Sequence, residues 1–235
     1  MANITSNGSS VYASITEVSA YWNARPCNVR HSPKPVGTKE YFDEVEARKY
    51  FVEAHIPGFA DFDRWKGKKV LEIGCGIGTD TINFARHGAQ VTAVDINKEA
   101  VRCVRANILL HHLEDRLDVR EGDLFAPVVG EQFDLILFNP PFYERPARDM
   151  ADRAWAGGSG NETLRRFLCA APAHLRPGGE LLIAGSTEAP YTANLPYTPG
   201  YTVRLIGRRE LIGEALYLFA LRPRPPLSRP TAPAT

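Results

Sequence analysis

The sequence has little that would place it in a membrane or in a secretory pathway. None of its apolar runs approaches the roughly 18 residues that a membrane-spanning helix requires. The N-terminal segment has neither a basic stretch nor an apolar core, so it does not look like a signal peptide. From these absences we expect a cytoplasmic protein without membrane association.

The chain also lacks metal-ligand patterns and an excess of charge. Its four cysteines form no Cys-x-x-Cys pair, and its six histidines have no zinc-like spacing, which predicts reduced, mostly buried thiols and no metal site. Lys and Arg together number 28 and Asp and Glu 27, a net charge of +1. Because a balanced chain exerts no long-range attraction on a polyanion, nucleic acid ranks low among the expected partners.

The composition divides the 235 residues into three parts. Residues 1–65 form an aromatic and basic arm, residues 66–222 alternate apolar strands with helices, and residues 223–235 are a proline-rich tail predicted to be disordered. Within the arm, a helix is predicted over 38–55, capped by Thr38 and ended by Pro57-Gly58. Its apolar side chains can share one face: Tyr41, Phe42, Val45, Phe51 and Val52.

The central part has the pattern of an α/β fold. Strands are predicted over 69–74, 90–95, 117–123, 133–139, 179–186, 201–207 and 214–221, and helices over 79–87, 98–112 and 161–175. Such alternation predicts a doubly wound parallel sheet with right-handed crossovers. The last two strands are separated by only a few residues, so they are expected to pair antiparallel.

A glycine-rich segment, LEIGCGIGTD, joins the first strand to the following helix. Its glycines fall at Gly74, Gly76 and Gly78, where they allow a sharp turn and a close approach to a ligand. The dinucleotide pattern G-x-G-x-x-G is not met, and no Gly-Lys-Ser/Thr phosphate loop is present. The segment therefore favours a nucleotide-like cofactor other than NAD.

Three carboxylates lie at the ends of the first three predicted strands, where α/β sheets bind ligands. Glu72 precedes the glycines, where it would repel a pyrophosphate and suit a cationic group or an amine. Asp95 lies where such folds bind ribose hydroxyls. Asp123 can face an adenine amino group, although a solvated loop acid remains the alternative.

The tetrapeptide Asn139-Pro140-Pro141-Phe142 ends the nearly all-apolar strand FDLILF. The prolines fix the backbone and leave carbonyls free, and the Asn139 side chain adds an acceptor. A planar NH2 group can donate two hydrogen bonds into this fork while Phe142 stacks on it. The motif predicts methylation of a planar nitrogen, with catalytic roles for Asn139, Pro140 and Phe142; a tight turn ending a buried strand is the alternative.

Over residues 68–222 these segments resemble the class I S-adenosylmethionine-dependent methyltransferases. The resemblance implies a Rossmann-like seven-stranded sheet of order 3-2-1-4-5-7-6 with strand seven antiparallel. It implies that the glycines hold the methionine part of S-adenosylmethionine, with Asp95 on the ribose and Asp123 on the adenine. The expected cofactor contacts are Glu72, Gly74, Gly76, Gly78, Asp95, Ile96, Asp123, Leu124 and Asn139.

Within this class, NPPF is similar to the (N/D)PP(Y/F) motif of members that methylate glutamine amides, adenine or guanine. The stretch AWAGGSGNETLRRFLCAAPAHLRPGGELLIAGS is similar to the HemK-type glutamine methyltransferases, especially their short eukaryotic and archaeal branch. Two departures stand out. Phe142 replaces tyrosine, and the first 65 residues form an aromatic arm where that branch carries little.

We interpret the arm as a cap over the active site, although it can also simply pack on the sheet. The expected substrate contacts are Trp22, Arg25, Asn28, Arg30, His31, Tyr143 and Trp155. A capped aromatic pocket favours N-methylation of an amide, guanidino or amino group on a small molecule, amino acid or peptide.

Other functions stay open. One is a release-factor-like glutamine methyltransferase, and another is a nucleic-acid adenine or guanine N-methyltransferase. The latter would use a basic face made of Arg145, Arg148, Arg153, Arg165 and Arg166. A cofactor-binding subunit without catalysis and a nicotinamide oxidoreductase rank lower.

Overall fold

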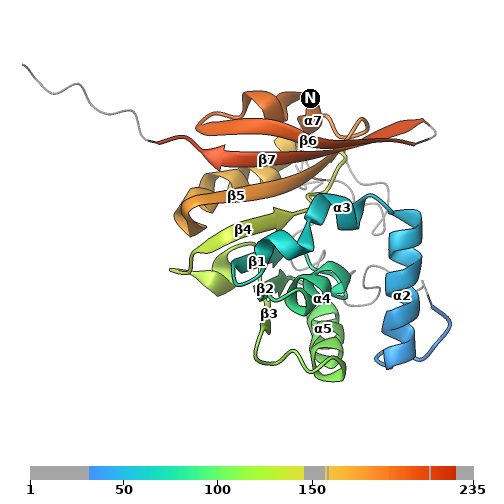
Figure 1. Ribbon diagram of the computed structural model, residues 1–235. Helices are drawn as coiled ribbons and strands as arrows, with labels where there is room; N and C mark the ends of the chain where they lie inside the picture. The colour runs from blue at the N-terminus through green and yellow to red at the C-terminus, as the bar shows by residue number, and fades with distance from the viewer. Residues whose placement is uncertain (1–31, 146–156, 158, 212, 226–235) are drawn as a thin grey trace, which may run out of the picture.

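One seven-stranded sheet organises the protein (Figure 1). The computed structural model describes residues 32–145, 157, 159–211 and 213–225. The strand order is β3-β2-β1-β4-β5-β7-β6, which confirms the predicted order. The strands are β1 (Lys69–Ile73), β2 (Gln90–Asp95), β3 (Leu117–Glu121), β4 (Phe133–Phe138), β5 (Leu175–Ser186), β6 (Tyr201–Leu211) and β7 (Glu214–Pro223).

Strand direction decides where a ligand can bind. Strands β3, β2, β1, β4 and β5 are parallel to one another, whereas β7 is antiparallel to both β5 and β6. The carboxyl ends of the five parallel strands therefore meet at one edge of the sheet, which we call the carboxyl edge. All the predicted cofactor and catalytic motifs follow these strands.

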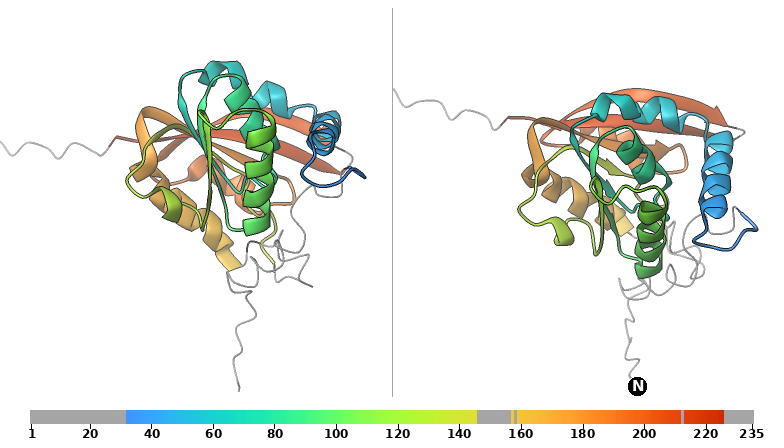
Figure 2. Two further views of the ribbon diagram at one scale, coloured as in Figure 1. Left: turned by 90° about the horizontal axis from the view of Figure 1, so that it is seen from below. Right: turned by 60° about the horizontal axis from the view of Figure 1, so that its bottom comes forward.

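Helices cover both faces of the sheet (Figure 2). On one face, α4 (Thr79–Arg86) and α5 (Lys98–Leu110) bury Ile82 and Val104 against Val91 of the sheet. On the other, α6 (Glu162–Ala170) and α7 (Tyr191–Asn194) bury Phe167 and Tyr191. The remaining segments are α3 (Ile56–Ala60) and the 3₁₀ turns Phe62–Trp65, Ala126–Val128, Ser159–Asn161, Ala171–His174 and Leu195–Tyr197.

The arm helix α2 (Lys39–Val52) stands beside α4 and α5 (Figures 1 and 2). Thr38 caps it as predicted, because its side chain accepts a hydrogen bond from the Tyr41 N–H at 3.2 Å. Tyr41, Phe42 and Val45 are buried, packed with Ile77 of the glycine turn.

Two details of the predicted helix are wrong. Phe51 and Val52 are 85% and 56% exposed, because in the last turn Lys49 and Tyr50 face α4 instead. Pro57 does not simply stop the helix. It lies in the first turn of α3, where a missing N–H costs nothing.

The segment before β5 also differs from prediction. The helix predicted over 161–175 ends at Ala170, a 3₁₀ turn containing Pro172 follows, and β5 begins at Leu175. The pairing of β4 with β5 shifts register between Phe133 and Leu135, which accommodates the Pro-Gly-Gly stretch within the strand. At the other end of the domain, β7 continues to Pro223. In the described part of the chain, no helix has the length and apolarity needed to cross a bilayer.

Candidate active site

The glycine turn, residues 74–78, leads from β1 into α4. Its last glycine packs closely against α5, whereas its first glycine does not. Gly78 is the N-cap of α4 with φ +84°, and a Cβ there would lie 2.8 Å from Val104 Cγ2. Apart from its chain neighbours, no heavy atom of the described residues lies within 4 Å of a Cβ placed at Gly74, whose φ is +74°. The first glycine therefore borders open space at the carboxyl edge, while the third is fixed against α5.

Asp95 joins the glycine turn to the end of β2. Its Oδ2 accepts a hydrogen bond from the Gly76 N–H at 2.8 Å, and its Oδ1 accepts one from the Asn97 N–H at 2.9 Å. Burial raises the pKa of the Asp95 carboxyl, and the N–H donors of Asn97, Gly76 and Ile96 oppose that rise. A carboxylate oxygen has a second lone pair, so Asp95 can hold the turn and still accept a ligand hydroxyl.

Glu72 lies under the glycine turn in a cluster of charges. Its Oε2 accepts a short hydrogen bond from the Thr81 hydroxyl of α4. Burial is the main cause that raises the pKa of Glu72, to about 7, and the negative charge of Asp80 is the second cause. Lys49 opposes this rise. The charge of Glu72 therefore changes close to neutral pH.

Asp123 follows β3 and is already paired. Its carboxylate accepts a short ion-paired hydrogen bond from Arg166 of α6. The next residue, Leu124, is buried with φ +48°, a left-handed conformation that a bulky side chain rarely adopts. The two residues border an open depression of about 550 Å³, whose lining residues are Asp123, Leu124, Phe125, Ala126, Arg166, Cys169 and Ala170.

The NPPF motif presents its polar side chain at the carboxyl edge. Asn139 is exposed, and among the described residues its side chain makes no hydrogen bond, whereas Phe138 and Pro140 on either side are buried. Phe142 is half-buried against the core, with its ring centroid 6.4 Å from that of Tyr191. The motif thus has a free acceptor beside an aromatic ring that the core supports.

The residues after NPPF are held by the turn that precedes α6. The Gly157 N–H donates to the Tyr143 carbonyl at 2.7 Å. The Glu144 carboxylate accepts from the Gly160 N–H at 2.8 Å and from Asn161 Nδ2 at 3.1 Å. We did not predict these contacts of Glu144 and Asn161; the only signal was the GGSGN stretch before a helix.

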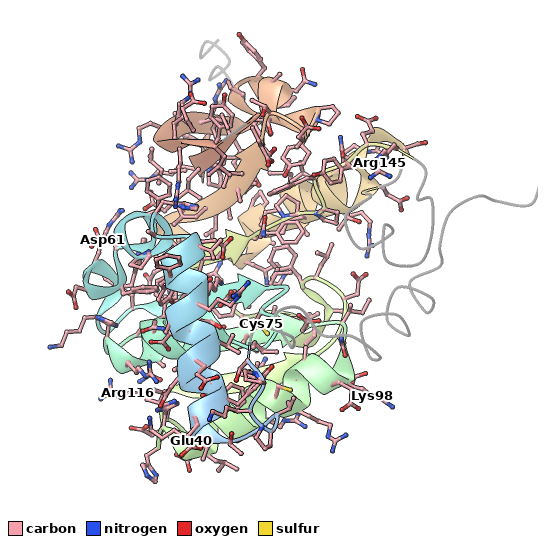
Figure 3. The ribbon with its side chains drawn as sticks, turned by 90° about the vertical axis from the view of Figure 1, so that its right-hand side faces the viewer. Glu40, Asp61, Cys75, Lys98, Arg116 and Arg145 are labelled. Atoms are coloured by element: carbon pink, nitrogen blue, oxygen red, sulfur yellow. The ribbon has the colours of Figure 1, made fainter. Side chains whose placement is uncertain are left out.

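The carboxyl edge brings several predicted site residues together. Figure 3 looks onto this side of the molecule, where Cys75, Lys98 and Arg145 follow β1, β2 and β4. Tyr143 also lies at this edge, with the Arg145 guanidinium 5.1 Å from the Tyr143 ring centroid.

Other predicted site residues lie outside the described part of the chain: Trp22, Arg25, Asn28, Arg30, His31, Arg148, Arg153 and Trp155.

The residues present fit S-adenosylmethionine. The open space at Gly74 leaves room for a ligand against the backbone. The carboxylates of Glu72 and Asp95 suit the cationic methionine part and the ribose hydroxyls. No group of three or more His, Cys, Asp or Glu side chains that could hold a metal occurs within the described residues.

Comparison with known proteins agrees with this chemistry. Residues 59–203 match the family described as methyltransferase small domain. A putative protein N5-glutamine methyltransferase of Methanocaldococcus jannaschii is 36% identical over 162 residues, which are 66% of this chain and 81% of the relative. The ribosomal RNA small subunit methyltransferase C of Alcanivorax borkumensis is 35% identical over 126 residues, 54% of this chain and 34% of the relative.

Among solved structures, one match is the T. thermophilus 16S rRNA methyltransferase RsmC in complex with AdoMet and guanosine. Its TM-score is 0.55 at 20% identity, covering 83% of this chain and 44% of that one, which supports the fold. The chain thus spans about a third of the length of one relative and under half of this structure.

The low rank given to nucleic acid among the partners is wrong. Relatives of this chain include ribosomal RNA methyltransferases. Net charge is a sum over the whole chain and does not describe local surface charge; Arg165, for example, is exposed on α6. Arg166, in contrast, is occupied by Asp123.

Proposed function

We propose that this chain, which belongs to the methyltransferase small domain family, is an S-adenosylmethionine-dependent N-methyltransferase that methylates the side-chain amide of a glutamine in a protein. The observation that carries the proposal is the exposed, unpartnered Asn139 side chain at the end of β4, among the described residues. The relative that this chain covers to 81% of its length bears the name of a protein glutamine methyltransferase, which supports the same acceptor.

Asn139 and Pro140 orient the acceptor amide. The Asn139 side-chain oxygen and the Pro140 carbonyl accept the two N–H bonds of the glutamine NH2 group. Because Pro140 and Pro141 have no N–H, the motif presents acceptors without a competing backbone donor. Two such hydrogen bonds fix the plane of the amide and turn its nitrogen toward the cofactor side of the site.

Phe142 and the cofactor half of the site complete the arrangement. Phe142 offers the flat amide a stacking surface, and Tyr191 behind it keeps the ring in place. When bound, S-adenosylmethionine supplies an electrophilic methyl group. Catalysis by this chain is then mainly positioning, which can contribute several powers of ten. The amide nitrogen loses a proton after it has gained the methyl group, so no strong base is required.

The proposal is tested by methyl transfer from labelled S-adenosylmethionine to a translation release factor, the substrate class of the HemK-type enzymes that the motif resembles. We expect label on the release factor, none on a variant whose acceptor glutamine is replaced by alanine, and none with Asn139→Ala enzyme. Equal labelling of the alanine variant would overturn the glutamine assignment.

Guanine in ribosomal RNA is the second candidate acceptor. Its exocyclic NH2 is planar and can donate into the same Asn139–Pro140 fork. The ribosomal RNA methyltransferase relative favours it, and so does the exposed Arg165 of α6, which is next in sequence to the Arg166 that pairs with Asp123. In the same assay with small-subunit ribosomal RNA, label on the RNA but not on the release factor would establish this candidate instead.

A further inference from the structure

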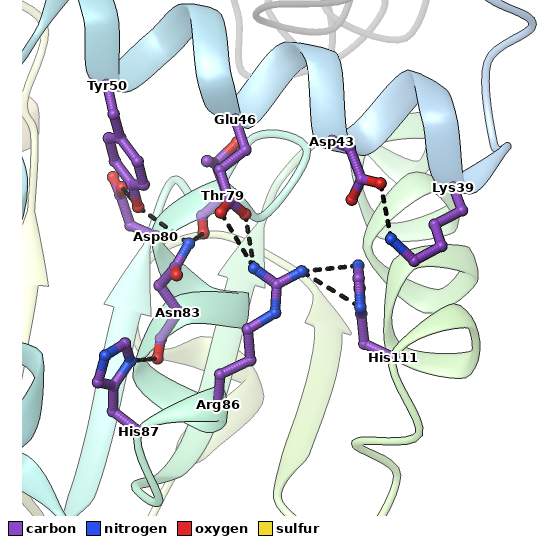
Figure 4. Close-up of polar contacts among 10 residues, drawn as sticks. All are labelled: Lys39, Asp43, Glu46, Tyr50, Thr79, Asp80, Asn83, Arg86, His87 and His111. Carbon is purple, nitrogen blue, oxygen red and sulfur yellow. Dashed lines mark hydrogen bonds and ion pairs between the residues drawn. The ribbon is translucent and has the colours of Figure 1, made fainter.

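Helix α2 lies outside the segment that matches the family, yet it reaches the cofactor site. The match covers residues 59–203, whereas α2 spans Lys39–Val52. From its last turns, Lys49 and Tyr50 reach Asp80 in the first turn of α4, directly after the glycine turn. Figure 4 shows the contact of Tyr50 with Asp80. This helix therefore precedes the matched segment and contacts the helical turn that follows its glycine turn.

The contacts centre on Asp80. Lys49 Nζ lies 2.5 Å from Asp80 Oδ2, and the Tyr50 hydroxyl donates to Asp80 Oδ1 at 2.9 Å. Asn83 Nδ2 lies 3.1 Å from the Tyr50 oxygen and 2.9 Å from the Thr79 carbonyl. The Lys49 and Asp80 side chains are 14% and 18% exposed, so water screens their attraction only weakly. Both oxygens of Asp80 are held by α2.

Asp80 is coupled to Glu72 through the next residue of α4. Thr81 donates its hydroxyl to Glu72, so the two carboxylates are anchored on consecutive positions of one helical turn. Lys49 interacts electrostatically with both of them. When Glu72 is ionised, the ammonium of Lys49 does not balance the charge of both carboxylates, and the excess negative charge lies on the side where the methionine part of the cofactor is expected.

We propose that Lys49 is a positioning residue for the cofactor site: it holds the first turn of α4 through Asp80, and its positive charge favours the carboxylate form of Glu72 that receives the cationic cofactor. The glycine turn ends in that same helical turn, so a shift of Asp80 would move the amides of Gly76 and Gly78 as well. Affinity for S-adenosylmethionine then depends on a helix that precedes the shared domain.

Helix α2 provides its own matched control. Glu46 also bridges α2 to α4, with Arg86 Nη1 at 2.8 Å, but it contacts the far end of α4 (Figure 4). A substitution there weakens the docking of α2 without touching the charges at Glu72. Lys39, paired with Asp43 on the same helix at 2.6 Å, controls for loss of a lysine charge.

The first experiment measures the dissociation constant of S-adenosylmethionine by calorimetry between pH 6 and 8.5 for Lys49→Met, Lys49→Arg, Glu46→Gln and Lys39→Met. We expect about tenfold weaker binding for Lys49→Met, equivalent to one lost charge-assisted contact, and recovery in Lys49→Arg. We expect values within about twofold of the parent for both controls. Equal losses in Lys49→Met and Glu46→Gln would show that α2 acts only by docking and would overturn the proposal.

The second experiment uses the ligand-free protein. The carboxyl carbon of Glu72 is titrated by NMR, and removal of Lys49 should move its midpoint to higher pH. The groups that face Glu72 are Asp80, Lys49, Asp95 and the Cys75 thiol, so the same titration in Asp80→Asn should move the midpoint to lower pH. An unchanged midpoint in Lys49→Met would contradict the proposal even if binding weakens.

A double-mutant cycle covers the case in which Lys49→Met folds poorly because it leaves Asp80 buried and unpaired. In a background that carries both Asp80→Asn and Glu72→Gln, Lys49→Met should change the dissociation constant by less than about twofold, because the lysine acts through these two carboxylates. A further tenfold loss in that background would mean that Lys49 works by another route, and the proposal would fail.

Discussion

The carboxyl edge of the sheet has two halves that are built in different ways. In the cofactor half, formed by Glu72, the glycine turn and Asp95, each acidic side chain already accepts hydrogen bonds from the protein. In the acceptor half, formed by Asn139–Tyr143, the only polar side chain of the NPPF motif is exposed and makes no hydrogen bond with the described residues. One half is organised by side-chain bonds and the other by rigid backbone.

This difference matches what each half must bind. A cofactor that is the same in every turnover can be met by carboxylates fixed in advance. An acceptor amide or amine needs free hydrogen-bond acceptors, and these can stay unpartnered only where water reaches them. In the acceptor half, Pro140 and Pro141 fix the backbone, whereas in the cofactor half hydrogen bonds fix the side chains. The two halves should therefore respond differently to substitution.

The largest expected effect lies in the acceptor half. Asn139→Ala should lower kcat by about 10²–10³-fold, because it removes a preorganised acceptor, while the dissociation constant of S-adenosylmethionine changes little. Phe142→Tyr, which keeps the ring, should retain most of the activity. Single-turnover kinetics and calorimetry separate the two quantities. Equal losses of cofactor affinity and of kcat in Asn139→Ala would contradict the separation of the carboxyl edge into a cofactor half and an acceptor half.

The two ends of the glycine turn should respond in opposite ways. Gly74→Ala adds a methyl group to open space, so it should weaken cofactor binding by about tenfold with only the modest destabilisation expected for a positive φ. Gly78→Ala forces a Cβ against Val104 at the same backbone cost, so it should destabilise the fold by about 2–4 kcal/mol. Thermal unfolding with and without S-adenosylmethionine distinguishes them. Similar melting temperatures for the two variants would be inconsistent with this packing.

Glu72 should link cofactor affinity and stability to pH. Its pKa of about 7 means that affinity should rise as pH increases through neutrality, and Glu72→Gln should flatten that dependence. For stability the sign is the reverse. The pKa in the folded state lies above the ordinary value of 4.5, so the native state holds the proton more tightly and stability falls as pH rises from 4.5 to about 7.

Glu72→Gln should remove this fall of folding stability with rising pH, because glutamine has no proton to lose in this range. Above pH 7 the variant should melt about 2–4 °C higher than the parent, which corresponds to roughly 1 kcal/mol in a domain of this size. At pH 4.5 the two proteins should melt together. Calorimetric melting at both pH values checks this, and a variant that is less stable at pH 8 would contradict the assignment.

The smallest effect is expected at the pair of Asp123 and Arg166. Arg166 is 46% exposed and Asp123 29%, so the pair should contribute at most about 1 kcal/mol to folding. Arg166→Met should leave the melting temperature nearly unchanged. It also frees Asp123 for the adenine contact that we predict, so cofactor affinity should stay equal or improve slightly. A clear loss of affinity would show that Arg166 itself holds the ligand.

Much of the cofactor half could be predicted because its signals are local. The period of two in the strands, the helix breaks and the order of the strands with glycines between them all lie in short stretches of chain. Asp95 and Gly76, though 19 residues apart, meet because each ends a parallel strand of the same sheet. The strand order followed from the same pattern with the family resemblance.

Less of the acceptor half and of the arm could be predicted. Glu144 and Asn161 meet across 17 residues, and the GGSGN stretch indicates a turn there without identifying Glu144 as its partner. The outer part of the predicted α2 face was wrong, since Phe51 is exposed and Lys49 points inward. A helical pattern defines which residues share a face, but not which part of that face a neighbour will cover.

The sequence by itself determined the alternating strands, the glycine turn, the carboxylates at the strand ends and the NPPF fork, because each depends on backbone chemistry within a few residues. Only the tertiary structure decided that Lys49 and Tyr50 would meet Asp80, 31 and 30 residues further along the chain, and that Arg166 would occupy Asp123. Such pairs form where packed helices bring side chains together and exclude water. The spacing of residues along the chain specifies neither the packing of the helices nor the exclusion of water.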